Sequence, residues 1–222
     1  MSEWIQVGPV GSRAYLAVPD SGSGPGVLVL HAWWGLTSVF TDVCDRLAAA
    51  GFVALAADLY ADGATADSIP GAEALMQAQD NAAQEAIVLA SVDKLRQLPA
   101  ATGSAIGVIG FSMGGYWAFN VSQVRPDVIG AVVAIYGAGE GEFSDAKAAY
   151  LGHFAENDDY EDIDYVRSLE TSIREAGREA TFHFYPGTNH WFVESNRPDV
   201  YNAEATELVW ERTTAFLNTH LG

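Results

Sequence analysis

Basic residues are scarce in this chain of 222 residues. Its 11 lysines and arginines stand against 29 acidic residues, which gives a formal charge of -18 at pH 7, and lysine occurs only at Lys94 and Lys147. Such an excess of negative charge repels the phosphates of nucleic acids and the surfaces of anionic membranes. The composition therefore predicts that neither nucleic acid nor membrane is a partner.

Cysteine and long apolar runs are also scarce. Because Cys44 is the only cysteine, an internal disulfide bond is excluded. Apolar residues recur at helical spacing around Cys44, so we expect it to be a small buried side chain without a chemical role. No apolar run is long enough to span a membrane, and the chain does not open with a positively charged segment followed by an apolar one. We therefore expect a cytoplasmic protein.

The sequence does contain enough apolar material for one sizeable core. Hydrophobic residues make up 49% of the chain and no internal repeat is visible, so we expect a single domain over residues 1–222. Short apolar runs, typical of parallel strands covered on both faces, alternate with segments of helical periodicity. This alternation predicts an α/β fold with a mostly parallel, doubly wound sheet flanked by helices on both faces. The expected strands are 4–7, 12–18, 26–31, 52–57, 105–110, 128–136, 149–155 and 181–185, and the expected helices are 38–50, 72–98 (as one or two helices), 113–124, 163–176 and 201–217.

The segment Gly110–Gly115 combines a serine with the glycines of a tight turn. It reads Gly-Phe-Ser-Met-Gly-Gly between an expected strand and an expected helix, which is the context of the nucleophile elbow in the α/β-hydrolase fold. Side chains at positions 110 and 114 would collide with neighbouring backbone, which explains the glycines. We expect Ser112 to be the nucleophile and the backbone N–H of Met113 to be one donor of the oxyanion hole.

His190 follows the last expected strand, in a loop that precedes the last expected helix. It comes after Ser112 in the chain, where this fold places its general base. The sequence therefore predicts His190 as the base. The other histidines are expected to be structural, because they fall within strand patterns, at the end of the first core strand or near the end of the chain; they are His31, His153, His183 and His220.

An acidic cluster lies between Ser112 and His190 in the chain, directly after another expected strand. A triad needs one carboxylate there, because a carboxylate fixes the tautomer of the histidine and stabilises the imidazolium ion. Position alone leaves Glu156, Asp158 and Asp159 open as that carboxylate.

Two tryptophans stand at the end of the first core strand, in the segment His31–Gly35. The backbone N–H of Trp33 is expected to be the second donor of the oxyanion hole. Trp33 and Trp34 are also expected at the substrate pocket, with packing of one of them against the first helix as the alternative.

Taken together, these segments resemble the dienelactone hydrolase family, from about Gly26 almost to the end of the chain. The resemblance implies that Asp158 is the acid of the triad. The motifs that carry the resemblance are Ala32–Leu36, Ala57–Tyr60, Gly110–Gly115, Ala155–Tyr160, and His190–Phe192 with Arg197–Pro198.

The chain departs from the pattern of the family members that open dienelactones. Those members carry a cysteine where this chain has Ser112 and a glutamate where it has Ala32. Glu194 stands where they have an arginine that binds the substrate carboxylate, and no arginine occurs between Arg46 and Arg96. A pocket without these cations is expected to prefer neutral or apolar substrates over anionic lactones.

Three aromatic residues, Trp34, Trp191 and Phe192, are expected to bind such substrates. The sequence thus predicts a serine hydrolase that cleaves carboxylic esters or lactones through an acyl-enzyme. Its expected partner is a small-molecule ester or lactone, and the mechanism requires no metal or organic cofactor. An acyltransferase or thioesterase on the same scaffold stays open, since only the acceptor of the acyl group differs. The alternative from another class is a binding protein without turnover, and the sequence does not specify an oligomeric state.

Overall fold

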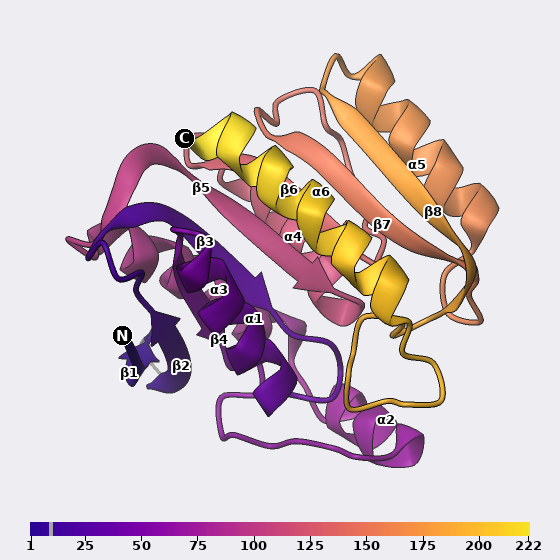
Figure 1. The fold of residues 1–222 in the computed structure, drawn as a ribbon, viewed down its shortest axis with the longest axis horizontal. Helices are drawn as coiled ribbons and strands as arrows, with labels where there is room; N and C mark the ends of the chain where they lie inside the picture. Colours follow the sequence, from indigo (N-terminus) through magenta and orange to yellow (C-terminus); the bar gives the residue numbers. More distant parts are fainter. Residues whose placement is uncertain (9–10) are drawn as a thin grey trace.

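One mixed sheet of eight strands forms within residues 1–8 and 11–222, the part of the chain that the computed structural model describes. The strands stand in the order β1-β2-β4-β3-β5-β6-β7-β8 (Figure 1). β1 pairs with β2 and β2 with β4 in antiparallel orientation, and the remaining pairs are parallel. The strands are β1 (Ser2–Val7), β2 (Ser12–Ala17), β3 (Gly24–Leu30), β4 (Val53–Ala57), β5 (Ala101–Phe111), β6 (Ile129–Ile135), β7 (Ala149–Asn157) and β8 (Ala180–Asn189).

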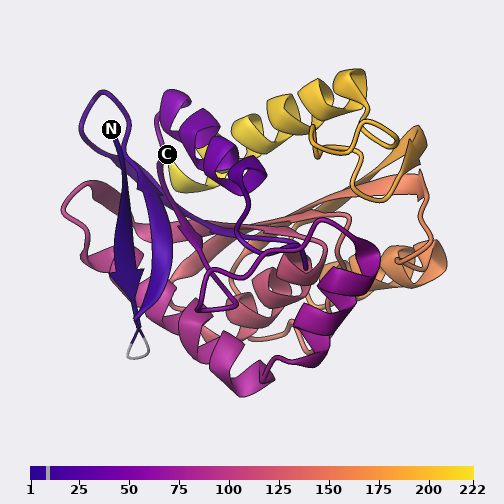
Figure 2. The same cartoon turned by 90° about the horizontal axis from the view of Figure 1, so that it is seen from below.

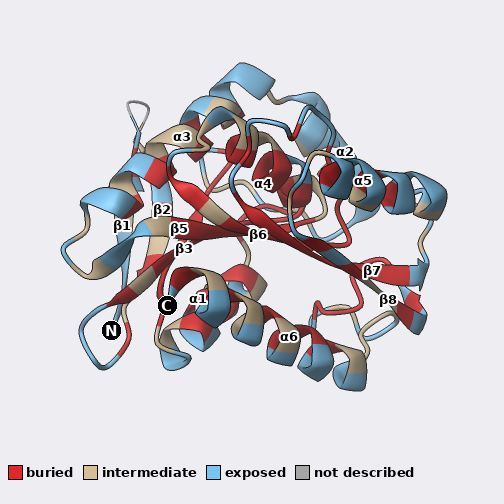
Figure 3. Ribbon diagram, turned by 90° about the horizontal axis from the view of Figure 1, so that it is seen from above, coloured by how far each residue is buried: buried red, intermediate tan, exposed pale blue. Residues whose placement is uncertain are grey.

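Helices cover both faces of this sheet. α1 (Ser38–Ala49) and α6 (Ala203–Leu221) lie on one face, and α3 (Asn81–Gln97), α4 (Met113–Val124) and α5 (Ile163–Glu175) lie on the other (Figures 2 and 3). The apolar residues accordingly form two cores, and consecutive residues of one strand serve different cores: Leu28 packs with the α3 and α4 side, and Val29 with the α1 and α6 side. This sheet, covered on both faces, confirms the predicted α/β fold class. Among the described residues, no helix has both the length and the apolar character needed to cross a membrane.

The expected helical segment 72–98 consists of two helices. α2 (Ile69–Gln77) ends before Asp80, and α3 begins directly after it. The Asp80 side chain accepts a hydrogen bond from the backbone N–H of Ala82 (2.9 Å), so it caps the start of α3. This break fixes where α3 begins and therefore which of its residues face the sheet.

β8 runs beyond its expected end at Tyr185 as far as Asn189, so residues 186–189, expected in the loop, belong to the strand, and His190 lies in the turn that follows. Pro186, which has no N–H to donate, is tolerated because β8 is an edge strand that bonds only to β7. After an irregularity in the register, Asn189 pairs with Asn157. His190 therefore stands directly at the carboxyl end of a strand.

Candidate active site

Parallel strands bring the predicted residues to one edge of the sheet. Ser112 follows β5 directly, Asp158 follows β7, and His190 follows β8. Trp33 comes soon after β3, which pairs with β5. Because the carboxyl ends of parallel strands lie at the same edge, residues far apart in the chain meet there.

Ser112 stands on a strained turn between β5 and α4. Its φ of +50° lies in the left-handed region that non-glycine residues rarely adopt, at a cost on the order of 1–3 kcal/mol. The turn is held because the Ser112 N–H donates to the Ile135 carbonyl (3.0 Å). A Cβ at Gly110 would collide with the carbonyl oxygen of Gly114, so the glycine allows the chain to turn this tightly.

The side chains of Ser112, His190 and Asp158 form one hydrogen-bonded row. His190 Nε2 lies 2.9 Å from Ser112 Oγ, and His190 Nδ1 lies 2.8 Å from both carboxylate oxygens of Asp158. The side chains of His190 and Asp158 are 3% and 0% exposed, so this hydrogen-bonded pair is shielded from water. A carboxylate can only accept from Nδ1–H, which leaves the lone pair of Nε2 facing the serine hydroxyl.

The other two carboxylates of the acidic cluster do not reach His190. Glu156 accepts a hydrogen bond from the N–H of Gly187 (2.9 Å), and Asp159 is exposed. Asp158 is instead held in place by its own loop, since its Oδ1 accepts from the N–H groups of Tyr160 (2.9 Å) and Glu161 (3.0 Å). The structure thus places Asp158, the acid that the family resemblance implied, next to His190.

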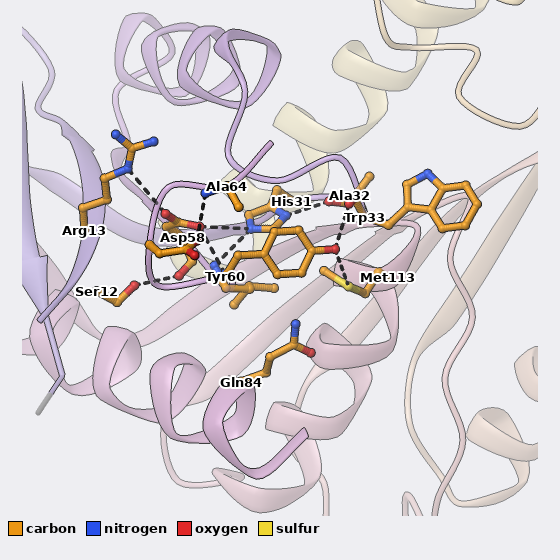
Figure 4. A network of polar contacts seen from close by, with 12 residues as sticks. Ser12, Arg13, His31, Ala32, Trp33, Asp58, Tyr60, Ala64, Gln84 and Met113 are labelled. Atoms are coloured by element: carbon orange, nitrogen blue, oxygen red, sulfur yellow. Dashed lines mark hydrogen bonds and ion pairs between the residues drawn. The ribbon is translucent and has the colours of Figure 1, made fainter. Parts of the chain in front are cut away.

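Trp33 and Met113, which carry the two predicted oxyanion donors, line the same cavity as Ser112. Within residues 1–8 and 11–222, the backbone N–H groups of Trp33 and Met113 have no protein acceptor. The Trp33 carbonyl accepts from the Tyr60 hydroxyl (2.7 Å), which also lies 3.8 Å from Met113 Sδ (Figure 4). Tyr60 therefore joins the two segments that carry the free N–H groups.

A cavity of about 350 Å³ opens beside Ser112. Besides Ser112, its polar lining includes Asn81, Gln84 and Glu161, and no lysine or arginine is among the described residues that line it. Among all described residues, including those of the cavity, no three histidine, cysteine or acidic side chains are grouped as a metal site requires. The remaining lining is largely aromatic and includes Trp33, Tyr116, Trp117 and Tyr160, together with Met76 and Met113.

Trp34, Trp191 and Phe192 do not line this cavity, in contrast to the expectation that they bind substrate. Trp34 is 2% exposed and Phe192 is fully buried. The Arg197 guanidinium lies 3.4 Å above the Trp34 ring, and the Trp34 and Trp191 rings pack 5.2 Å apart. These contacts hold the segment after β8 against the core, because large flat rings offer much buried area there.

The cavity also contains polar residues that the sequence analysis did not identify. Glu161 accepts a hydrogen bond from the Ala138 N–H (3.1 Å), and burial raises the pKa of this carboxyl to about 7. Gln84 is 3% exposed. Its position could have been noticed, because it lies one helical turn before Ile87 and Val88, on the buried face of α3.

Glu194, the residue in the place of the family arginine, is buried behind His190. Its Oε1 accepts from the Tyr136 hydroxyl (3.0 Å), and the Tyr136 ring packs 4.8 Å from the His190 ring. Glu194 also pairs with Arg197 (3.4 Å). Burial is the main cause that raises the pKa of Glu194 to about 7, so its carboxyl is protonated over much of the acidic range.

The sequence and the fold of the chain are similar to those of known proteins. Residues 12–221 match the sequence model described as "Dienelactone hydrolase family". The chain is 35% identical over 218 residues to "Protein usf" of Aquifex pyrophilus and 30% identical over 218 residues to "Putative carboxymethylenebutenolidase" of Aquifex aeolicus, with 94% of each chain covered in both cases. Its fold is similar to the crystal structure of a dienelactone hydrolase-like promiscuous phosphotriesterase from metagenomic libraries, with a TM-score of 0.89, 20% identity, and 100% and 99% of the two chains covered.

Proposed function

The chain belongs to the dienelactone hydrolase family and has the α/β-hydrolase fold, and on this premise we propose that it hydrolyses neutral carboxylic esters or lactones through an acyl-enzyme on Ser112. The observation that carries the proposal is the hydrogen-bonded row from Ser112 Oγ through His190 to the buried Asp158 carboxylate. A serine hydroxyl is a weak nucleophile by itself, so it needs a base in this position.

In the proposed mechanism, Ser112 Oγ attacks the carbonyl carbon while His190 Nε2 takes the hydroxyl proton. The carbonyl oxygen becomes an oxyanion that the N–H groups of Trp33 and Met113 stabilise. His190 then returns the proton to the leaving oxygen as the carbon–oxygen bond breaks. Water attacks the acyl-enzyme in the second half and gives a proton to His190, which passes it to Ser112 Oγ as the acid leaves. Asp158 stays ionised throughout and orients the imidazole ring.

The proposed preference for neutral substrates rests on the charge of the cavity. Names such as carboxymethylenebutenolidase among the relatives indicate that lactones are a reasonable substrate class to test. In this chain, however, Glu161 lines the cavity and no cation among the described lining residues would balance a substrate carboxylate. An anionic group would therefore lose its hydration without gaining a positively charged partner.

Intact mass after incubation with a fluorophosphonate tests the nucleophile. We expect one adduct on the wild-type protein and none on Ser112→Ala. The absence of an adduct on either protein would favour a binding protein without turnover. Initial rates with neutral aryl esters and with an anionic dienelactone then test the substrate class, and faster saturating turnover of the anionic lactone would contradict the proposed preference.

A further inference from the structure

Gln84 presents an unused hydrogen-bond donor beside the nucleophile. It lies on α3, lines the same cavity as Ser112, and is 3% exposed. Its Nε2 is buried and has no hydrogen-bond partner among the described residues. A buried amide donor without an acceptor costs on the order of 1–3 kcal/mol, so such a group in a substrate cavity requires an explanation.

The orientation of this amide is fixed by Trp117. The Trp117 Nε1–H donates to Gln84 Oε1 (3.2 Å). An indole N–H can only donate, so the oxygen of Gln84 must face it and the NH₂ group must face elsewhere. Figure 4 shows the Gln84 side chain rising from α3 toward Tyr60 and Met113, which is the side of the oxyanion donors.

The position of His190 indicates which half of an ester occupies this cavity. His190 must lie beside the leaving oxygen, because it returns a proton to that atom. The cavity lining includes Ser112, Met113 and Trp33 but not His190. This arrangement favours a leaving group outside the cavity and an acyl group that extends into it toward Gln84.

We propose that Gln84 is a specificity-determining residue that donates a hydrogen bond from Nε2 to a neutral acceptor oxygen on the acyl group. The acceptor is neutral because Glu161 shares the cavity with Gln84 and no cation is among the described lining residues. The substrate class is thus an ester or lactone whose acyl chain carries a ketone, ether or hydroxyl oxygen. The inference rests on the proposed function, since it needs an acyl group bound at Ser112.

Two pairs of p-nitrophenyl esters test the inference, with 4-oxopentanoate against 4-methylpentanoate and 5-oxohexanoate against 5-methylhexanoate. Within each pair a ketone oxygen replaces a methyl group at equal size. After subtraction of the uncatalysed rate, we expect wild-type kcat/KM to be about tenfold higher for the oxo ester in at least one pair, as one good hydrogen bond provides. We expect Gln84→Met, which keeps the length of the side chain but removes the donor, to bring this ratio close to one.

Two further variants distinguish the loss of the Nε2 donor from a change in side-chain packing. Gln84→Glu keeps an oxygen for Trp117 but has no NH₂ group, so at a pH where its carboxyl is ionised and has no O–H donor we expect its ratio to fall as far as that of Gln84→Met. Ser91→Ala, on the same helix, removes a buried hydroxyl that bonds only to the Ile87 carbonyl (2.7 Å), and we expect it to keep the wild-type ratio. A ratio within one preparation does not depend on the fraction of folded enzyme, so partial unfolding of a variant cannot produce the effect.

The outcomes distinguish this inference from the proposed function. If the wild type hydrolyses both members of each pair equally, or if Gln84→Met keeps the wild-type ratio, the role of Gln84 is refuted while the esterase activity stands. If no ester is hydrolysed and the fluorophosphonate leaves Ser112 unmodified, the proposed function fails and the inference fails with it.

Discussion

Two histidine–aspartate pairs stand at the same edge of the sheet and are built in the same way. His31 follows β3 and Asp58 follows the neighbouring parallel strand β4, just as His190 follows β8 and Asp158 follows the neighbouring parallel strand β7. The side chains of both pairs are buried. The pairs therefore share residue types, topology and burial, and they differ in the hydrogen bonds of their imidazole rings.

The His31 ring is saturated by backbone groups. Its Nδ1 donates to the Ala32 carbonyl (2.6 Å), and its Nε2 accepts from the Leu59 N–H (3.0 Å). Its Nε2 lies 3.9 Å from the Asp58 carboxylate, which instead accepts from the Tyr60 N–H and from Arg13 (Figure 4). Burial lowers the pKa of His31, and protonation of Nε2 would break the bond to Leu59.

The comparison shows that a buried histidine beside an aspartate is not by itself a catalytic unit. Both rings carry the proton on Nδ1 and offer the lone pair of Nε2. At His31 that lone pair faces a peptide N–H, which does not give up its proton in this chemistry. At His190 the lone pair faces the Ser112 hydroxyl, which gives up its proton in the proposed mechanism when it attacks a carbonyl carbon. The proposed catalytic role of His190 therefore rests on the partner of its Nε2.

The largest expected effect separates the two aspartates by activity. We expect Asp158→Asn to lower kcat on a neutral aryl ester by about 10⁴-fold, because the amide no longer fixes the tautomer of His190. The matched variant Asp58→Asn should lower kcat by less than tenfold. Steady-state kinetics on folded protein measures both, and a comparable loss in the two variants would show that His31 takes part in turnover.

The second effect concerns Glu194, a third buried carboxylate, which reaches His190 only through the Tyr136 ring. Its pKa of about 7 in the folded protein exceeds the ordinary value of 4.5, so the folded state binds a proton that the unfolded state releases. The stability that this proton contributes is fully present below pH 4.5 and is lost as the pH rises through 7. The shift corresponds to about 3 kcal/mol of unfolding free energy.

Glu194→Gln removes this titration while it keeps an acceptor for the Tyr136 hydroxyl. Urea unfolding at pH 5 and pH 8.5 should therefore show the wild type losing about 2 to 3 kcal/mol more than the variant over this interval. Parallel changes in the two proteins would mean that Glu194 is ionised at both pH values.

The third effect separates the two aspartates by stability. We expect Asp58→Asn to lower the free energy of unfolding by about 2 kcal/mol, because Asp58 is fully buried and accepts from the Tyr60 N–H and from Arg13. This loss of stability should be smaller than that caused by leaving a buried charge without a partner, since Arg13 is 45% exposed and its guanidinium can be hydrated by water. Urea unfolding at pH 7 measures the difference, and an unchanged midpoint would show that the Asp58 network adds no stability.

Much of this comparison was accessible from the sequence. Short apolar runs followed by polar residues predicted the strands that precede Ser112, Asp158 and His190, and the three residues meet because parallel strands place their carboxyl ends at one edge. The sequence did not predict which backbone groups bond to His31, since they depend on how the chain turns after β4. The orientation of the aromatic residues was also hidden: Trp34 and Phe192 are equally suited to a pocket and to a core.

The path of the chain after β8 and the cavity lining were harder to predict for a different reason. Pro186 reads as a loop residue, and only the edge position of β8 makes a strand possible there. Gln84 comes from a helix far from the triad in sequence, and its role depends on a contact with Trp117 that no local pattern shows. Local patterns thus located the strands, whereas the end of β8 and the contacts between distant elements required the structure.

The smallest expected effect tests the choice among the acids that sequence position left open. Asp159 is exposed and adjacent to Asp158, so Asp159→Asn changes the local charge as much as Asp158→Asn does but leaves the bonds of His190 intact. We expect kcat to change by less than twofold, because an exposed charge is screened by water and salt. Assays at low and high ionic strength should give the same result. A loss near 10⁴-fold in Asp159→Asn, with Asp158→Asn active, would show that the loop after β7 rearranges to present Asp159 and that the observed row is not the catalytic one.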